Sequence, residues 1–264
     1  MATEAHLFAA AHAAAGGDNA AVWVVKRATG THSADAAVTA HASCVLRHAL
    51  APPGVDRVAQ RYVTRPALLR GRKFDVRVYV AVRAFAPALV AAVDGRYYGR
   101  LAAAPFALDA ASLTRFDTHF TVGWYAAEAK AGAAGAAPAE AASDDGALPA
   151  LLSRRQLEAA AAAEGYDWSA ADAAMRACLR ELFTAAGRTV GAFPAGRALY
   201  GCDVLFERDD AGALQPRLLE VNFCGDLATL LSRVPGGAPG FVDDVMGYLF
   251  GADATPAAEL QPLA

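Results

Sequence analysis

Lysine is scarce in this 264-residue chain, since Lys26, Lys73 and Lys130 are the only lysines and every other basic residue is arginine. An arginine presents a planar fork of donors and a lysine a flexible point charge, so the two are not interchangeable at a phosphate. The excess of alanine and arginine fits the hypothesis of a GC-rich coding sequence. Against that background each of the three lysines is of greater interest.

Long apolar runs are absent, because no stretch reaches the length of about 20 residues that a membrane helix needs. The first fifteen residues lack a basic start followed by a long apolar stretch, so we expect no secretory signal. The four cysteines form no CxxC pair and no zinc-ligand spacing, which favours a reducing, cytosolic setting. The net charge of −3 argues against a general nucleic-acid binder. We therefore expect a cytoplasmic protein with neither membrane nor nucleic acid as partner.

The periodicity of apolar residues predicts an α+β domain of mixed strands and helices with an antiparallel core. Strands are expected at residues 22–25, 58–63, 73–82, 88–93, 96–101, 199–206 and 218–222. Helices are expected at residues 38–50, at 241–250 and, as one or two segments, at 151–186. The Asp94-Gly95 turn predicts that the strands on either side of it form a hairpin.

Composition divides the chain into a main domain, residues 21–251, and two tails. Residues 1–20 are rich in alanine and are expected to form a helix or a loose N-terminal tail, and residues 252–264 a C-terminal tail. Within the main domain, residues 126–150 are rich in alanine and glycine without apolar periodicity. This pattern predicts a flexible surface insertion.

The last two predicted strands carry a group of oxygen donors. A turn-rich segment, residues 209–212, joins them and predicts a hairpin. Side chains alternate along a strand, so Glu220 and Asn222 share one face. A buried face should not carry a carboxylate and an amide without a reason, and Asp203 on the neighbouring strand adds a third oxygen donor. Hard divalent cations such as Mg²⁺ take ligands of this kind and share the phosphates in nucleotide sites.

The strand from residue 73 to residue 82 alternates charged and apolar side chains. Lys73, Asp75 and Arg77 lie on one side, and this pattern has two interpretations. One is a solvated strand face with weak cross-strand ion pairs. The other is a phosphate-facing strand, on which the two cations neutralise phosphate oxygens and Asp75 orients a ribose hydroxyl, a metal or a substrate amine.

Four segments, in this order along the chain, resemble the tubulin–tyrosine ligase family. They are Trp23-Val24-Val25-Lys26, Gln60-Arg61-Tyr62-Val63, Lys73-Phe74-Asp75-Val76-Arg77-Val78-Tyr79 and Leu219-Glu220-Val221-Asn222. The third string is specific, and Asp203 strengthens the short fourth one. The resemblance extends from about Trp23 to Phe250. Residues 116–122, 197–203 and 241–245 also resemble one branch of this family.

The resemblance implies an ATP-grasp fold, in which ATP lies between two α+β lobes. It implies an enzyme that joins an amino acid to a carboxylate of a protein, typically tubulin, through an acyl phosphate. The implied cofactors are ATP and Mg²⁺, the implied partners are an amino acid and tubulin or another protein acceptor, and the implied location is the cytoplasm, including microtubules.

The resemblance also implies roles for individual residues. Phosphates would be contacted by Lys26 and Lys73, and the adenine hinge formed by Gln60, Arg61, Tyr62 and Val63. Asp75 and Arg77 would line the nucleotide and substrate side, Arg100 would lie near the acceptor, and these three would be the catalytic residues. Mg²⁺ would be held by Asp203, Glu220 and Asn222.

The sequence departs from the family's pattern at several points. Val122 stands where active members carry an Asn, Arg27 follows the first lysine in place of a Pro, and residues 224–226 replace a Ser-Pro-Ser type of run. An apolar residue cannot supply the hydrogen bonds of an amide, so Val122 favours an alternative, a catalytically impaired protein that binds nucleotide or tubulin on the same fold. A ligase with a small-molecule acceptor is a third hypothesis. Only about twenty residues precede Trp23, so we expect the family's N-terminal lobe to be missing or truncated.

Overall fold

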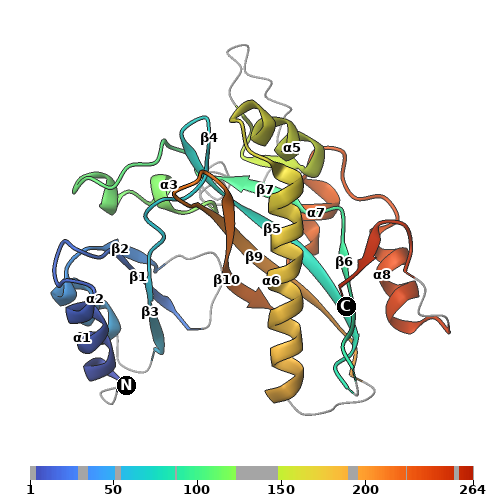
Figure 1. Ribbon diagram of the computed structural model, residues 1–264, viewed down its shortest axis with the longest axis horizontal. Coiled ribbons are helices and arrows are strands. Elements are labelled where there is room, and N and C mark those ends of the chain that lie inside the picture. Colours follow the sequence, from blue (N-terminus) through green and yellow to red (C-terminus); the bar gives the residue numbers. More distant parts are fainter. Residues whose placement is uncertain are drawn as a thin grey trace, which may run out of the picture. The chain divides into compact units, whose positions relative to one another are not determined.

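The computed structural model describes residues 4–28, 35–50, 55–86, 88–122, 148–189, 196–223, 225–252 and 256–263 (Figure 1). The chain forms two compact units. The first comprises residues 1–73 and 102–133, and the second comprises residues 74–101 and 134–264. Almost all of the insertion predicted at residues 126–150 lies outside the described residues.

The first unit contains a small antiparallel sheet in the order β2–β1–β3. The elements of this unit are α1 (Ala5–Ala14), β1 (Trp23–Arg27), β2 (Ala37–Thr39), α2 (Ala42–Leu50), β3 (Arg57–Arg61), β4 (Leu68–Leu69), the short 3-10 helix η1 (Ser112–Thr114) and α3 (Phe116–His119). Trp23 and Val25 are the buried side chains of β1, and they pack with Val45 of α2. Phe8 of α1 covers this cluster, so the alanine-rich N-terminal segment contributes to the core as a helix.

The second unit contains a larger antiparallel sheet whose main path is β10–β9–β5–β6–β11. β7 also pairs with β5, and β8 pairs with β7. The strands are β5 (Arg72–Ala84), β6 (Val90–Asp94), β7 (Tyr98–Leu101), β8 (Leu151–Ser153), β9 (Ala198–Arg208), β10 (Leu214–Asn222) and β11 (Leu260–Pro262). Mixed helices and antiparallel sheets confirm the predicted α+β class.

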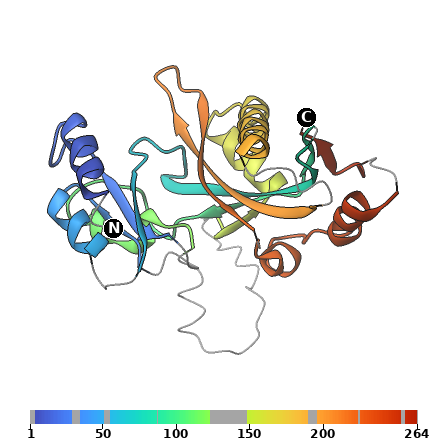
Figure 2. The same cartoon turned by 90° about the horizontal axis from the view of Figure 1, so that it is seen from below.

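Helices lie on both sides of the larger sheet (Figure 2). They are α5 (Arg154–Ala163), α6 (Trp168–Thr189), α7 (Leu227–Ser232) and α8 (Phe241–Phe250). On the face covered by α6, the ring of Trp168 lies 6.3 Å from that of Phe74 and 5.2 Å from that of Phe206, measured between centroids. Side chains alternate along a strand, so the opposite face of β5 carries Asp75, Arg77 and Tyr79. That face carries the candidate site.

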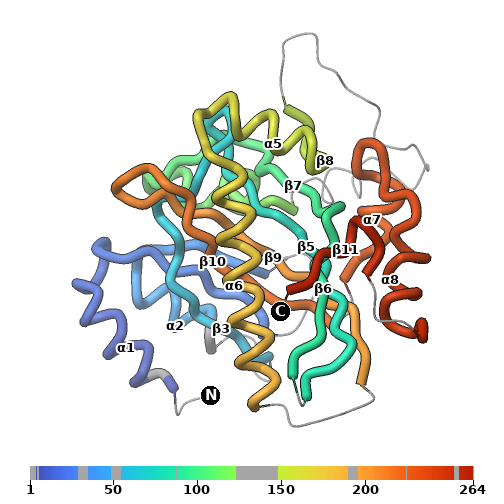
Figure 3. The backbone as a smooth tube through the Cα atoms, turned by 45° about the vertical axis from the view of Figure 1, so that its right-hand side comes forward, coloured from blue at the N-terminus to red at the C-terminus, as the bar shows by residue number. Residues whose placement is uncertain are grey.

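The final residues add an edge strand to this sheet. Figure 3 shows β11 running beside β6, and Leu260 is the cross-strand partner of Asp94. The main-chain hydrogen bond from Gly95 N to the Glu259 carbonyl oxygen, 2.8 Å long, extends this pairing. The segment expected as a C-terminal tail therefore contains a strand that covers an otherwise open edge.

The structure corrects two further expectations. β6 and β7 do not pair with each other, because both are antiparallel to β5, so the hairpin predicted at Asp94-Gly95 is wrong. The thirteen residues of β5 are enough to pair with β7 along one half and with β6 along the other. The helix predicted at residues 38–50 begins only at Ala42, because residues 37–39 pair with β1 as β2. The predictions of a final hairpin and of a helix at 241–250 are confirmed.

Candidate functional site

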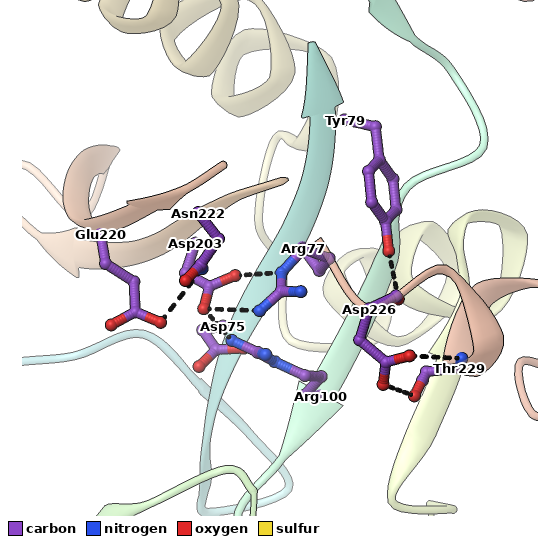
Figure 4. A network of polar contacts seen from close by, with 9 residues as sticks. All are labelled: Asp75, Arg77, Tyr79, Arg100, Asp203, Glu220, Asn222, Asp226 and Thr229. Atoms are coloured by element: carbon purple, nitrogen blue, oxygen red, sulfur yellow. Dashed lines mark hydrogen bonds and ion pairs between the residues drawn. The ribbon is translucent and has the colours of Figure 1, made fainter. Parts of the chain in front are cut away.

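Charged side chains from four neighbouring strands meet on the face of the larger sheet opposite α6 (Figure 4). Asp203 on β9 is the cross-strand partner of both Glu220 on β10 and Arg77 on β5. Asp75, two residues before Arg77, is paired in the same way with Arg100 on β7. Cross-strand partners point to the same face of a sheet, so pairing alone brings these five side chains together.

A β-bulge decides which side chain of β10 faces Asp203. The register between β9 and β10 shifts between Leu218 and Glu220, so Leu218 is opposite Val204 while Glu220 is opposite Asp203. Without this shift Leu219 would take that place. An extra residue in one strand re-aims the side chains that follow it, and the bulge therefore places a carboxylate beside Asp203.

Two arginines hold Asp203 from two directions. Arg77 donates to both of its carboxylate oxygens, through Nε to Oδ1 and through Nη2 to Oδ2, the latter at 3.0 Å. Arg100 places Nη2 2.9 Å from Asp203 Oδ2 and donates from Nε to Asp75 Oδ1 at 2.6 Å. All four residues are buried, with 4–7% of their surface exposed. The hypothesis of a solvated strand face is therefore wrong for Asp75 and Arg77.

The two guanidinium groups keep Asp203 ionised in spite of its burial. Desolvation raises the pKa of this carboxyl, but the charge of Arg100 and the hydrogen bonds from Arg77 outweigh it and lower the pKa to about 2. Burial lowers the pKa of Arg100, and Asp203 and Asp75 together more than reverse that effect, so the pKa of Arg100 is raised well above its ordinary value. Asp203 is therefore an anion held between the guanidinium groups of Arg77 and Arg100 at neutral pH.

Glu220 and Asn222 lie beside this network. Asn222 Nδ2 donates to Glu220 Oε1 at 3.2 Å, which confirms that the two side chains share a face. Glu220 is exposed and Asn222 is half-buried, so the expectation that this face is buried is wrong at these two positions. The network itself is buried, and the two residues form its exposed edge on β10.

Oxygen donors of this kind fit Mg²⁺ by their chemistry. Glu220 and Asn222 offer one carboxylate and one amide oxygen, the ligand types that a hard cation takes. Asp203 is less available to a metal, because two hydrogen bonds from Arg77 and the ion pair with Arg100 already engage both of its carboxylate oxygens. Among the described residues no group of three or more His, Cys, Asp or Glu side chains is arranged to hold a metal. A Mg²⁺ ion here would therefore be held mainly by Glu220 and Asn222.

Asp226 fixes the chain that leaves β10. Its side chain caps α7, with the Thr229 hydroxyl donating to Asp226 Oδ2 at 2.6 Å and the Thr229 N–H to Oδ1 at 3.4 Å. The hydroxyl of Tyr79 donates to the main-chain oxygen of Asp226 at 2.6 Å (Figure 4). Sequence reasoning missed this residue, although the spacing of Asp and Thr around an apolar run was a signal for a helix N-cap.

A second polar cluster lies within the first unit, around Lys73. This lysine is buried, and its ammonium donates to the Tyr62 hydroxyl at 3.0 Å and to the main-chain oxygen of His119 at 2.9 Å. The Tyr62 hydroxyl also lies 2.9 Å from His119 Nδ1, and His119 Nε2 lies 2.9 Å from the Ser112 carbonyl oxygen. Sequence reasoning did not select His119, because residues distant along the chain meet here only in the folded unit.

The structure places the other predicted nucleotide residues on or just after two strands of the small sheet. Lys26 is half-buried on β1, opposite Val58 of β3, and Gln60 is opposite Val24. Of the four expected hinge residues, Tyr62 donates its main-chain N–H to the Val22 carbonyl oxygen at 2.9 Å, so this group is used inside the protein. The adenine contact of Gln60, Arg61, Tyr62 and Val63 stays a prediction.

The fold and the site together define an α+β protein with antiparallel sheets and flanking helices, an architecture consistent with an ATP-grasp-like fold. A model of the Tubulin-tyrosine ligase family matches residues 3–253. The chain therefore belongs to this family, as the motifs predicted.

Among curated proteins, the chain is similar to Tubulin--tyrosine ligase-like protein 12 of Caenorhabditis elegans, with 27% identity over 244 residues. The alignment covers 87% of this chain and 32% of that relative, so the chain spans about a third of the relative's length. The described part of the chain contains no helix with the length and apolar character needed to cross a membrane.

Proposed function

We propose that this protein is an ATP- and Mg²⁺-dependent ligase that joins an amino acid to a carboxylate of a protein, with tubulin as the acceptor. The observation that carries this proposal is the meeting of Asp203, Glu220 and Asn222 on one face of the sheet, in a chain that belongs to the tubulin-tyrosine ligase family. These are the residues to which the family resemblance assigns the metal.

In the proposed reaction the acceptor carboxylate attacks the γ-phosphate of ATP, which gives an acyl phosphate and ADP. The amine of the incoming amino acid then attacks the acyl carbon and displaces inorganic phosphate, which leaves an amide bond. Two anions must approach each other in the first step, so positive charge near the phosphates lowers the barrier. When bound, Mg²⁺ would neutralise part of the phosphate charge.

The residues of this chain would position the reacting groups and neutralise the negative charge of the phosphates, and no nucleophilic side chain is needed. Lys73, whose ammonium is buried, is a proposed phosphate contact of the first unit, as is Lys26 on β1. Arg77 and Arg100 are held by carboxylates, so their proposed contribution is to fix Asp203 and Asp75 in one arrangement. Cys202, although close in sequence, is buried with a pKa raised to about 12 by desolvation, which does not suit a nucleophile.

A second candidate is a protein of the same fold that binds nucleotide or tubulin without turnover. Two observations favour it. Val122 cannot supply the amide that active family members are expected to carry, and the carboxylate of Asp203 is already engaged by hydrogen bonds from Arg77 and by the ion pair with Arg100. The ligase requires nucleotide binding, the second candidate binds nucleotide or tubulin, and the two differ in catalysis.

Nucleotide binding is tested first, by thermal melting with and without Mg-ATP. A ligand present at 100 times its dissociation constant stabilises the folded state by about 2.7 kcal/mol, which is a measurable shift in melting temperature. The absence of a shift at millimolar Mg-ATP in a folded sample contradicts the ligase and every form of the second candidate that binds nucleotide. Incubation with ATP, tubulin and a panel of labelled amino acids then separates them, because only the ligase gives ATP-dependent incorporation.

A further inference from the structure

The hydrogen bonds around Lys73 have a fixed direction. A lysine ammonium only donates, so the Tyr62 hydroxyl oxygen accepts from Lys73. A main-chain carbonyl only accepts, so His119 Nε2 carries a proton and donates it to Ser112. The single proton of the Tyr62 hydroxyl is then donated to His119 Nδ1, which is left without a proton. The contacts assign to His119 the neutral form with its proton on Nε2.

His119 therefore positions the Lys73 ammonium in two ways. Its main-chain oxygen accepts directly from the Lys73 ammonium, and its ring accepts the proton that orients the Tyr62 hydroxyl toward the same ammonium. The rings of Tyr62 and Phe106 pack edge-on against the imidazole, at centroid distances of 5.4 Å and 5.9 Å. The side chain of His119 has little room to turn, since only 1% of the residue is exposed.

A second proton on this imidazole would conflict with that arrangement. Nδ1–H would point at the Tyr62 oxygen, whose own proton would lose its acceptor, and a positive charge would be added beside the Lys73 ammonium. The charged groups that face His119 are Lys73 on β5 and the carboxylates of Asp109 and Asp117, and burial acts together with Lys73 to lower the pKa of His119. Both carboxylates act in the opposite direction, but they are weaker influences.

We propose that Tyr62 and neutral His119 are positioning residues that hold the Lys73 ammonium for a phosphate group of the nucleotide, and that protonation of His119 weakens nucleotide binding. This inference rests on the proposed function, because it needs a nucleotide phosphate as the ligand of Lys73. It adds a positioning role for Tyr62 and His119 and a dependence of nucleotide affinity on pH.

The test compares the affinity for Mg-ATP of the wild-type chain with that of His119→Gln, by calorimetric titration from about pH 8 to about pH 5, the range in which a histidine titrates. A glutamine can accept from Tyr62 and donate to Ser112, but it does not titrate. ATP itself also titrates, and its contribution is common to both proteins and cancels in the ratio of their dissociation constants. His6→Gln, which changes an exposed histidine, is the matched control.

We expect acidification to weaken the wild-type and His6→Gln proteins relative to His119→Gln by about ten-fold, the value of one lost charge-assisted hydrogen bond. If acidification changes the dissociation constant for Mg-ATP by the same factor in all three proteins, the inference is overturned and the proposed function stays in place. No binding by the wild-type protein at any pH overturns both.

Tyr62→Phe provides a second measurement, should His119→Gln fail to fold. It removes the hydroxyl and keeps the ring, so Lys73 loses one acceptor. We expect the affinity for Mg-ATP at about pH 8 to fall by about five-fold, while nitrogen NMR of the wild-type imidazole shows the proton on Nε2. An unchanged affinity, or a proton on Nδ1, contradicts the positioning role.

Discussion

Arg77 and Asp203 are cross-strand partners on β5 and β9, and the guanidinium of Arg77 donates to both carboxylate oxygens of Asp203. The sequence separates the two residues by 126 positions, and both are buried. A two-point contact of this kind fixes the orientation of the carboxylate as well as its position. The orientation of Asp203 within the candidate site therefore depends on Arg77.

Replacing Arg77 by alanine should destabilise the protein by about 3–5 kcal/mol, because it leaves the Asp203 charge buried with only Arg100 to balance it. Urea denaturation followed by circular dichroism measures this loss. Arg217→Ala, on the β9–β10 hairpin that carries Asp203, is a matched control, since Arg217 forms an ion pair with Glu207 and is more than half exposed. An exposed pair contributes about 0–1 kcal/mol. Equal losses for the two variants would show that burial of the pair is energetically unimportant.

The stability of the folded state should fall at acidic pH because the carboxylate of Asp203 becomes protonated. The pKa of this carboxyl is lowered to about 2 in the folded state, against about 3.9 in an unfolded chain. A carboxyl with a depressed pKa stabilises the folded state above its unfolded pKa, and this contribution is lost as pH falls from about 4 to about 2.

Urea midpoints measured across this pH range test the assignment. The Asp203→Asn protein, although less stable at neutral pH, should lose less stability on acidification than the wild type. Glu207→Gln, at an exposed pair on the same strand, should follow the wild type. An acid-induced loss in Asp203→Asn as large as in the wild type contradicts the assignment.

Glu220→Gln should abolish the Mg²⁺-dependent part of the stabilisation by ATP, because the amide has no charge to offer a cation. The measurement is the shift in melting temperature caused by ATP with Mg²⁺, minus the shift with ATP and a chelator. Glu207→Gln on the neighbouring strand controls for the loss of one negative charge from the hairpin. If the Mg²⁺-dependent shift persists in Glu220→Gln, the metal is held elsewhere.

Gly225→Ala should destabilise the turn that follows β10. A Cβ atom at this position would lie 2.8 Å from Tyr79 Cε1, and Tyr79 is fully buried and cannot move away easily. Forcing extra volume into a packed site costs about 1–3 kcal/mol.

Gly247→Ala on α8 is the opposite case, because a Cβ there meets nothing within 4 Å. A helical glycine replaced by alanine in open space should stabilise the protein by about 0.5–1 kcal/mol. Thermal melting compares the two variants. A stabilising Gly225→Ala would mean that the contact between this segment and Tyr79 is loose.

Much of this protein follows from local sequence pattern. The alternation in β5 and the turn-rich segment before β10 predicted strands and a final hairpin, because side-chain period and turn chemistry act over a few residues. Alternation also placed Asp75 and Arg77 on one face, and the motifs around Lys73 and Glu220 predicted the family. These properties need no knowledge of distant contacts.

Only the tertiary structure determined which charged side chains are buried, how the strands are aligned and which distant residues are in contact. A charge alternation is the same on a solvated face as on a buried one, and only packing showed that Asp75 and Arg77 are buried. The bulge that sets Glu220 opposite Asp203 and the pairing of both β6 and β7 with β5 depend on which strands meet. His119 reaches Lys73 across 46 positions. Contacts of this range are set by the sum of many weak interactions over the whole unit, and no short stretch of sequence contains them.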